Sequence, residues 1–118
     1  MASVSVSTGI AARRIGTIAV IYAGDYLNKL SGERIERECR IHFLSGSQAL
    51  VINFRETKIV NSIGISILLG IIEASKEAGS ILVFSEVNQQ TLSLFDMLGL
   101  TRHVRLARTE QEALSIVV

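Results

Sequence analysis

Apolar and polar positions alternate along the chain in blocks that predict strands and helices in turn. Gln48–Phe54 and Ser80–Ser85 are short and almost entirely apolar, which is typical of strands covered on both faces. His103–Ala107 predicts a short strand at the edge of a sheet. The chain therefore contains several strands, most of them expected to lie inside a layered domain.

Two further strands are predicted near the N-terminus. Ile15–Ala23 is rich in isoleucine and valine, and Val4–Ser7 alternates with a period of two, as a half-buried strand does. The gap between them is compatible with a hairpin in which Gly9 or Gly16 supplies the turn.

Helical periodicity appears in the segments between and after these strands. The predicted helices are Ser31–Leu44, Ser62–Ala78, Gln89–Leu98 and a last helix that the sequence Thr109-Glu110-Gln111-Glu112 opens as a capping box. Strands that alternate with helices after an initial pair of strands predict an α/β domain with a mixed β-sheet packed with about four α-helices.

The helix from Ser62 to Ala78 has a predicted inner and outer side. At about 100° per residue, the inner side collects Gly64, Ile67, Leu68, Ile71, Ala74, Ser75 and Ala78. The outer side collects Ser62, Ser66, Leu69, Glu73, Lys76 and Glu77, with Ile65 and Ile72 at its margin. An apolar cluster around an exposed serine is typical of a docking surface.

Asn61 and Ser62 stand where an apolar run ends and this helix begins. Both are good N-cap residues, because their side-chain oxygens can accept hydrogen bonds from amides that the first helical turn leaves free. Those amides and the helix dipole also favour an anion at this position. Ser62 is therefore either a helix cap or an exposed hydroxyl at which a phosphate would be tolerated.

The composition of the chain excludes several classes of function. The chain has 118 residues, a formal net charge of +1 and 48% apolar residues, which indicate one folded domain without a strong attraction to nucleic acid. No apolar run approaches the roughly 18 residues of a membrane span, and no signal-peptide pattern begins the chain. We therefore expect a cytoplasmic protein without a membrane or nucleic-acid partner.

Few residues offer metal-binding or catalytic chemistry. Cys39, the single cysteine, is expected to be a small buried residue, and neither His42 nor His103 has partners at metal-ligand spacing. A hydrolase elbow needs G-x-S-x-G, and Val60 stands at its first glycine. Glycine-rich phosphate loops are absent as well. We expect no metal, no cofactor and no enzymatic activity.

Several segments, in order and at matching spacing, resemble the STAS domains of bacterial anti-anti-sigma factors, also called anti-sigma factor antagonists. The matching segments are Gly24–Leu27, Val51–Phe54, Asn61–Ile65, Thr91–Leu100 and Thr109–Leu114. The resemblance covers the chain from Ile15 to its end and implies a single STAS domain over residues 1–118. Asn61 stands where that family usually has an acidic residue, and Ile63 and Leu27 are further departures.

The resemblance implies partner switching controlled at Ser62. The unphosphorylated protein would bind an anti-sigma factor that is also a serine kinase, and phosphorylation of Ser62 would end the binding. A serine phosphatase would reset the switch. Ser66 and Thr57 are weaker candidates for phosphorylation, and a STAS domain that binds a partner in another signalling or transport complex, without phosphorylation, is the alternative.

The expected docking surface combines the outer face of the Ser62 helix with the loop at Asp25 and Tyr26. Its expected contact residues are Asp25, Tyr26, Asn61, Ser62, Ile65, Ser66, Leu69 and Glu73. We expect a monomer or a weak dimer.

Overall fold

Five strands form the central sheet of the computed structural model, which describes residues 9–117. They lie in the order β1-β2-β4-β6-β7, with β1 at Ala12–Ile15, β2 at Ile18–Tyr22, β4 at Ala49–Asn53, β6 at Ile81–Ser85 and β7 at Arg105–Ala107. β1 is antiparallel to β2, and the other neighbours are parallel. The predicted mixed sheet is therefore confirmed.

The hairpin at the start of the sheet differs from its prediction. Its strands are β1 and β2, and Gly16, at φ 59°, lies in the two-residue turn between them. Ile15 consequently ends β1 instead of opening a long second strand. The strand predicted at Val4–Ser7 lies outside the described residues.

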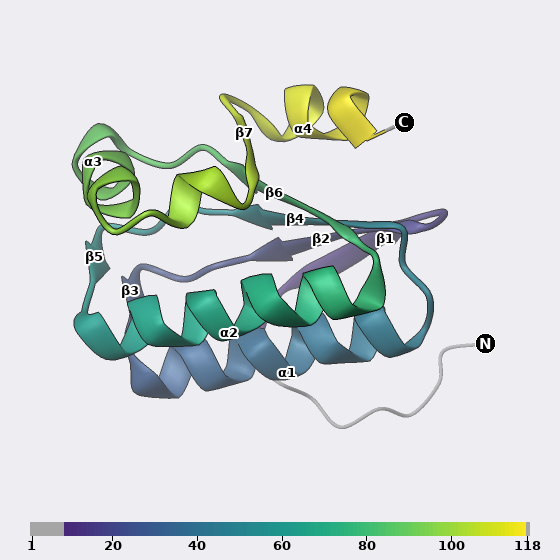
Figure 1. Cartoon of the computed structure of the whole chain (residues 1–118), viewed down its shortest axis with the longest axis horizontal. Coiled ribbons are helices and arrows are strands. Elements are labelled where there is room, and N and C mark those ends of the chain that lie inside the picture. The colour runs from purple at the N-terminus through teal and green to yellow at the C-terminus, as the bar shows by residue number, and fades with distance from the viewer. Residues whose placement is uncertain (1–8, 118) are drawn as a thin grey trace.

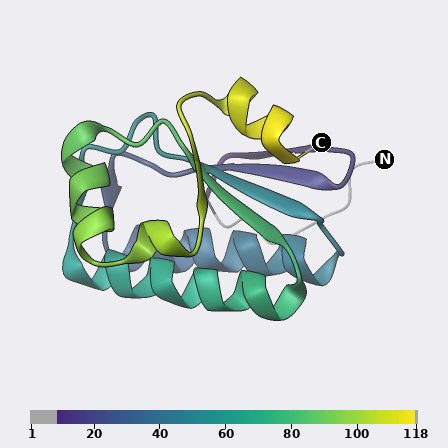
Figure 2. The ribbon, with the colours of Figure 1, turned by 45° about the horizontal axis from the view of Figure 1, so that its top comes forward.

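Four α-helices accompany the sheet in the described range: α1 at Lys29–Leu44, α2 at Ser62–Ala78, α3 at Gln89–Met97 and α4 at Glu110–Val117. A 3₁₀ helix, η1, spans Leu100–Arg102. α1 and α2 lie side by side along one face of the sheet and α4 lies on the other, while α3 lies beyond the end of the strands (Figures 1 and 2). None of the helices described between residues 9 and 117 has the length and apolar character needed to cross a membrane.

The central strands are buried on both faces, as their continuous apolar runs predict. In β2, Ala19 and Ile21 pack in the core under α1 and α2, whereas Ile18 and Val20 pack in a second core with Ala113 of α4. Alternate residues of a strand point to opposite faces, so one apolar strand serves both layers.

A second, two-stranded sheet leads the chain into α2. β3, at Tyr26–Leu27, pairs in parallel with β5, at Ile59–Val60. Figure 1 shows both strands at the same end of the molecule as α3, beside the start of α2. This small sheet fixes the residues that surround Ser62.

The inner face of α2 is broader than predicted. Ile65 and Ile72, expected at the margin of the outer face, are only 7% and 2% exposed, whereas Ala78 is exposed. Both side chains belong to the core that also holds Phe95 of α3 and Leu100 of η1, so the apolar arc of α2 is covered beyond the part that faces the sheet.

Candidate functional site

Asn61 closes the turn between β5 and α2. Its Oδ1 accepts a hydrogen bond from the amide of Gly64 at 2.8 Å, and its backbone is extended, as an N-cap requires. Its Nδ2 donates to the hydroxyl of Tyr26 at 3.4 Å. Asn61 is therefore the helix cap, and it also joins α2 to β3.

Ser62 is the first residue of α2 and is exposed. In the described part of the chain, its hydroxyl makes no hydrogen bond. Of the two roles left open for Ser62, that of the helix cap belongs to Asn61 instead. The first turn of α2 carries no acidic side chain. A free hydroxyl thus stands at the positive end of the helix dipole, where negative charge is tolerated.

Backbone hydrogen bonds hold the Asp25 loop beside this turn. The carbonyl of Asp25 accepts from the amides of Lys58 at 2.8 Å and Ile59 at 3.2 Å. The hydroxyl of Thr57 donates to the carbonyl of Gly24 at 2.7 Å, and Thr57 is only 2% exposed. The side chain of Thr57 is consequently unavailable to a kinase in this fold.

The structure brings most of the predicted contact residues to one surface. Asp25 and Tyr26 are exposed beside the start of α2, and Ser66, Leu69 and Glu73 are exposed along its outer face at helical spacing. Ile65 is the exception, because its side chain belongs to the core. Their part in binding stays a prediction.

Two apolar residues near Ser62 were missed by the sequence analysis. Ile59 in β5 is 58% exposed, and Ile63, next to Ser62, is 49% exposed. In the helical projection Ile63 lies between the inner and outer sides, about 100° from Ser62, so the period gave no clear signal. No sequence signal was available for Ile59, because a two-residue strand is too short to show a period.

The hydroxyl of Ser62 is far from either histidine. His103 lies with Nδ1 3.1 Å from Nζ of Lys76. Lys76 is about 20 Å from Ser62 along the helix axis at roughly 1.5 Å per residue. His42 is a buried residue of the last turn of α1, with Nε2 3.0 Å from Oε2 of Glu38. No serine–histidine pair of the kind that activates a nucleophile therefore forms at Ser62.

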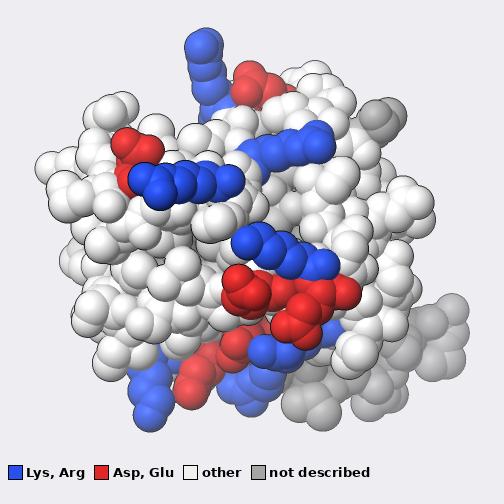
Figure 3. All heavy atoms as spheres, viewed as in Figure 1, with Lys and Arg blue, Asp and Glu red and all other residues white. Residues whose placement is uncertain are grey.

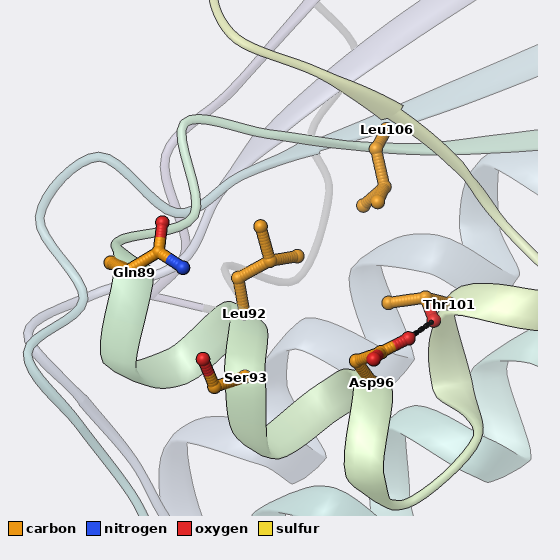
Figure 4. A pocket seen from close by; sticks show the side chains of 6 residues that line it. All are labelled: Gln89, Leu92, Ser93, Asp96, Thr101 and Leu106. Atoms are coloured by element: carbon orange, nitrogen blue, oxygen red, sulfur yellow. Dashed lines mark hydrogen bonds between the residues drawn. The ribbon is translucent and has the colours of Figure 1, made fainter.

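A pocket between α3 and β7 offers no catalytic cluster either. Leu92 of α3 and Leu106 of β7 line it, together with Gln89, Ser93, Asp96 and Thr101 (Figure 4). Its one carboxylate, that of Asp96, accepts a hydrogen bond from the hydroxyl of Thr101 at 2.9 Å. Within residues 9–117 there is also no group of three side chains suited to hold a metal ion.

Cys39 is a core residue, as predicted. It is 0% exposed, and burial raises the pKa of its thiol far above the usual range, with the neighbouring Glu38 and Glu36 adding to the effect. Only the thiolate is a good nucleophile, so this thiol is unreactive at neutral pH.

Residues 9–113 match the family model of the STAS domain. An anti-sigma-factor antagonist (STAS) domain protein from Planctomyces limnophilus has a similar structure, with a TM-score of 0.80 and 16% identity over 92% of this chain and 97% of that one. An anti-sigma factor antagonist from Mycobacterium paratuberculosis has a similar structure too, with a TM-score of 0.75 and 21% identity over 92% of each chain.

The Bacillus cell fate determinant SpoIIAA, solved in its phosphorylated form, is a further structural neighbour. Its TM-score is 0.73, with 19% identity over 92% of this chain and 99% of that one. At such identities, these likenesses establish the fold alone.

Proposed function

The chain belongs to the STAS domain family, and we propose that it is an anti-sigma factor antagonist that phosphorylation of Ser62 switches off. In its unphosphorylated form it binds an anti-sigma factor that is also a serine kinase, and a serine phosphatase restores it. It acts by protein contact in the cytoplasm as a monomer or weak dimer, without enzymatic activity of its own.

The observation that carries this proposal is the exposed hydroxyl of Ser62 at a helix end that another residue caps. Because Asn61 satisfies the amide of Gly64, the serine is not needed to hold the helix together. Its hydroxyl has no hydrogen bond in the described part of the chain and is free to accept a phosphoryl group. The phosphorylated structure of SpoIIAA supports the proposal by analogy of fold.

The proposed docking surface surrounds this serine. It comprises Asp25, Tyr26, Ile59, Asn61, Ser62, Ile63, Ser66, Leu69 and Glu73, which are exposed or half-buried. Exposed apolar side chains beside polar ones are suited to a reversible protein interface.

A phosphate on Ser62 would act on this interface rather than on the fold. It adds about −1.5 to −2 charges at pH 7. The helix dipole and the free amides at the start of α2 tolerate that charge in the unbound protein. In the complex, the same charge would have to be buried in a surface that includes the apolar side chains of Ile59 and Ile63, neither of which can pair with it.

Incubation with ATP and each serine-kinase anti-sigma factor of the same genome tests the proposal. Intact-mass and peptide mass spectrometry should show one added phosphoryl group, mapped to Ser62 and absent from Ser62→Ala. Ser93→Ala, at an exposed serine of α3 outside the docking surface, is the matched control and should be phosphorylated as well as the wild type. Stable binding to another protein without phosphorylation would favour the constitutive STAS scaffold instead.

A further inference from the structure

A groove lies toward the opposite end of α2 from Ser62, where the helix passes β6 and the segment from η1 to β7. It encloses about 310 Å³ and is lined by Lys76 of α2, Ser80 before β6, and Arg102, His103 and Arg105. None of these residues belongs to the proposed docking surface. The groove is therefore a separate feature.

Every charged side chain that lines the groove is basic. Nζ of Lys76 lies 3.1 Å from Nδ1 of His103. Because an ammonium group only donates, Nδ1 accepts this bond and the ring proton stands on Nε2. Lys76, Arg102 and Arg105 thus supply charged donors to the lining, which holds no carboxylate.

The basic side chains are poorly neutralised by the protein. In residues 9–117, Arg102 and Arg105 form no ion pair, and Lys76 has only Glu73 within reach, at 3.9 Å on an exposed surface. Such an exposed pair is weak. The positive charge of the groove is therefore available to an external anion.

The surroundings favour a compact anion over a long one. Figure 3 shows basic side chains across the middle of this face, with acidic side chains gathered directly below them over α2. Glu73 and Glu77 are exposed on that helix. A nucleic acid or an extended acidic chain crossing the groove would meet both of these carboxylates, whereas a small anion would be close only to Glu73, the weak partner of Lys76.

We propose that this groove binds a small phosphate-bearing molecule with at least two negative charges. Arg102 and Arg105 hold its oxygens through paired N–H donors, and Lys76 contributes a point charge. The volume of the groove suits a ligand of about pyrophosphate size or somewhat larger.

Titration of the ¹⁵N-labelled protein with inorganic pyrophosphate at low ionic strength tests this proposal. Saturable amide shifts are expected at Ser80, His103 and Arg105, with weaker binding of inorganic phosphate. Arg105→Gln should lower the pyrophosphate affinity about tenfold, the loss of one charge-assisted contact. Arg102→Gln should lower it by a similar factor while leaving the fold intact.

Arg37→Gln is the charge-matched control, because Arg37 is exposed on α1 and does not line the groove. It should bind pyrophosphate as the wild type does. Absence of saturable shifts at the groove, or equal weakening by Arg37→Gln, would overturn the proposal. Binding of a phosphoserine peptide or an oligonucleotide at the groove without pyrophosphate binding would overturn it too.

Discussion

Asn61 and Ser62 are adjacent residues of types that both cap helices, and the structure gives them different tasks. Asn61 accepts from Gly64 and donates to Tyr26, whereas Ser62 is exposed at the first helical position. The sequence located this pair at the start of the helix but left open which of the two residues caps it. That choice depends on where the extended backbone ends, which no single residue type determines.

We therefore expect alanine substitutions at Asn61 and Ser62 to lower the stability of the protein by different amounts. Asn61→Ala should lower the free energy of unfolding by about 1 kcal/mol through loss of the cap. Ser62→Ala should change it by less than about 0.5 kcal/mol, as is usual for an exposed side chain without a special contact. Urea denaturation of both variants checks this, and a larger loss for Ser62→Ala would show that Ser62 supports the helix.

A second residue-scale prediction concerns Glu110 at the start of α4. Burial raises the pKa of its carboxyl group, but hydrogen bonds from Tyr22, Arg13 and Asn53 together outweigh burial and hold the pKa below its usual value. A carboxyl group whose pKa is lower in the folded state stabilises the fold above its unfolded pKa of about 4.3. That stabilisation is lost as pH falls through the folded pKa.

Thermal unfolding of wild type and Glu110→Gln from neutral pH downward measures this effect. The wild type should be the more stable protein near neutral pH, and the difference should shrink as pH falls below about 4. Glu33→Gln, at an exposed position on α1, should follow the wild-type profile. A difference between wild type and Glu110→Gln that stays constant with pH would contradict the assignment.

At the scale of elements, α2 lies very close to the small sheet at Gly64. A Cβ atom at this position would stand 2.5 Å from the carbonyl oxygen of Leu27 in β3. Only glycine permits this approach, which keeps Tyr26 beside the start of the helix. Gly70, two turns later, has no such neighbour, and its nearest atom would be Oε2 of Glu36 at 3.5 Å.

Alanine substitutions at the two glycines should therefore have opposite effects. Gly64→Ala should destabilise the protein by about 2–3 kcal/mol, because the clash is with backbone that cannot rotate away. Gly70→Ala should stabilise it by about 0.5–1 kcal/mol through higher helix propensity. Chemical denaturation measures the change in the free energy of unfolding of each variant. If Gly64→Ala were as stable as the wild type, α2 and β3 would be able to separate.

The bounds of α2 were predictable because its apolar period is long and Gly79 ends it in the left-handed conformation. Which residues of α2 face the core was harder to predict. The projection assumed one covered side, whereas Ile65 and Ile72, at its margin, are buried in the core that also holds Phe95 of α3 and Leu100 of η1. A neighbouring helix cannot be placed from the period of one helix alone.

For the whole molecule, the alternation of apolar strands and helices was sufficient to predict the α/β layers. Long-range pairing was harder: β3 and β5 have two residues each, and their sequences carry no signal that they pair with one another. The candidate site depends on that pairing. Ser62 and Tyr26 could be selected from the sequence, but the exposure of Ile59 could not.

The central claim is that negative charge at Ser62 ends partner binding without unfolding the protein. Isothermal titration with the anti-sigma factor that phosphorylates Ser62 tests it most directly, using wild type, Ser62→Ala and Ser62→Asp. We predict similar affinities for the first two, and for Ser62→Asp a loss of at least about tenfold, or 1.4 kcal/mol. Circular dichroism of Ser62→Asp should match the wild type. Wild-type affinity in Ser62→Asp, or equal losses in both variants, would contradict the account.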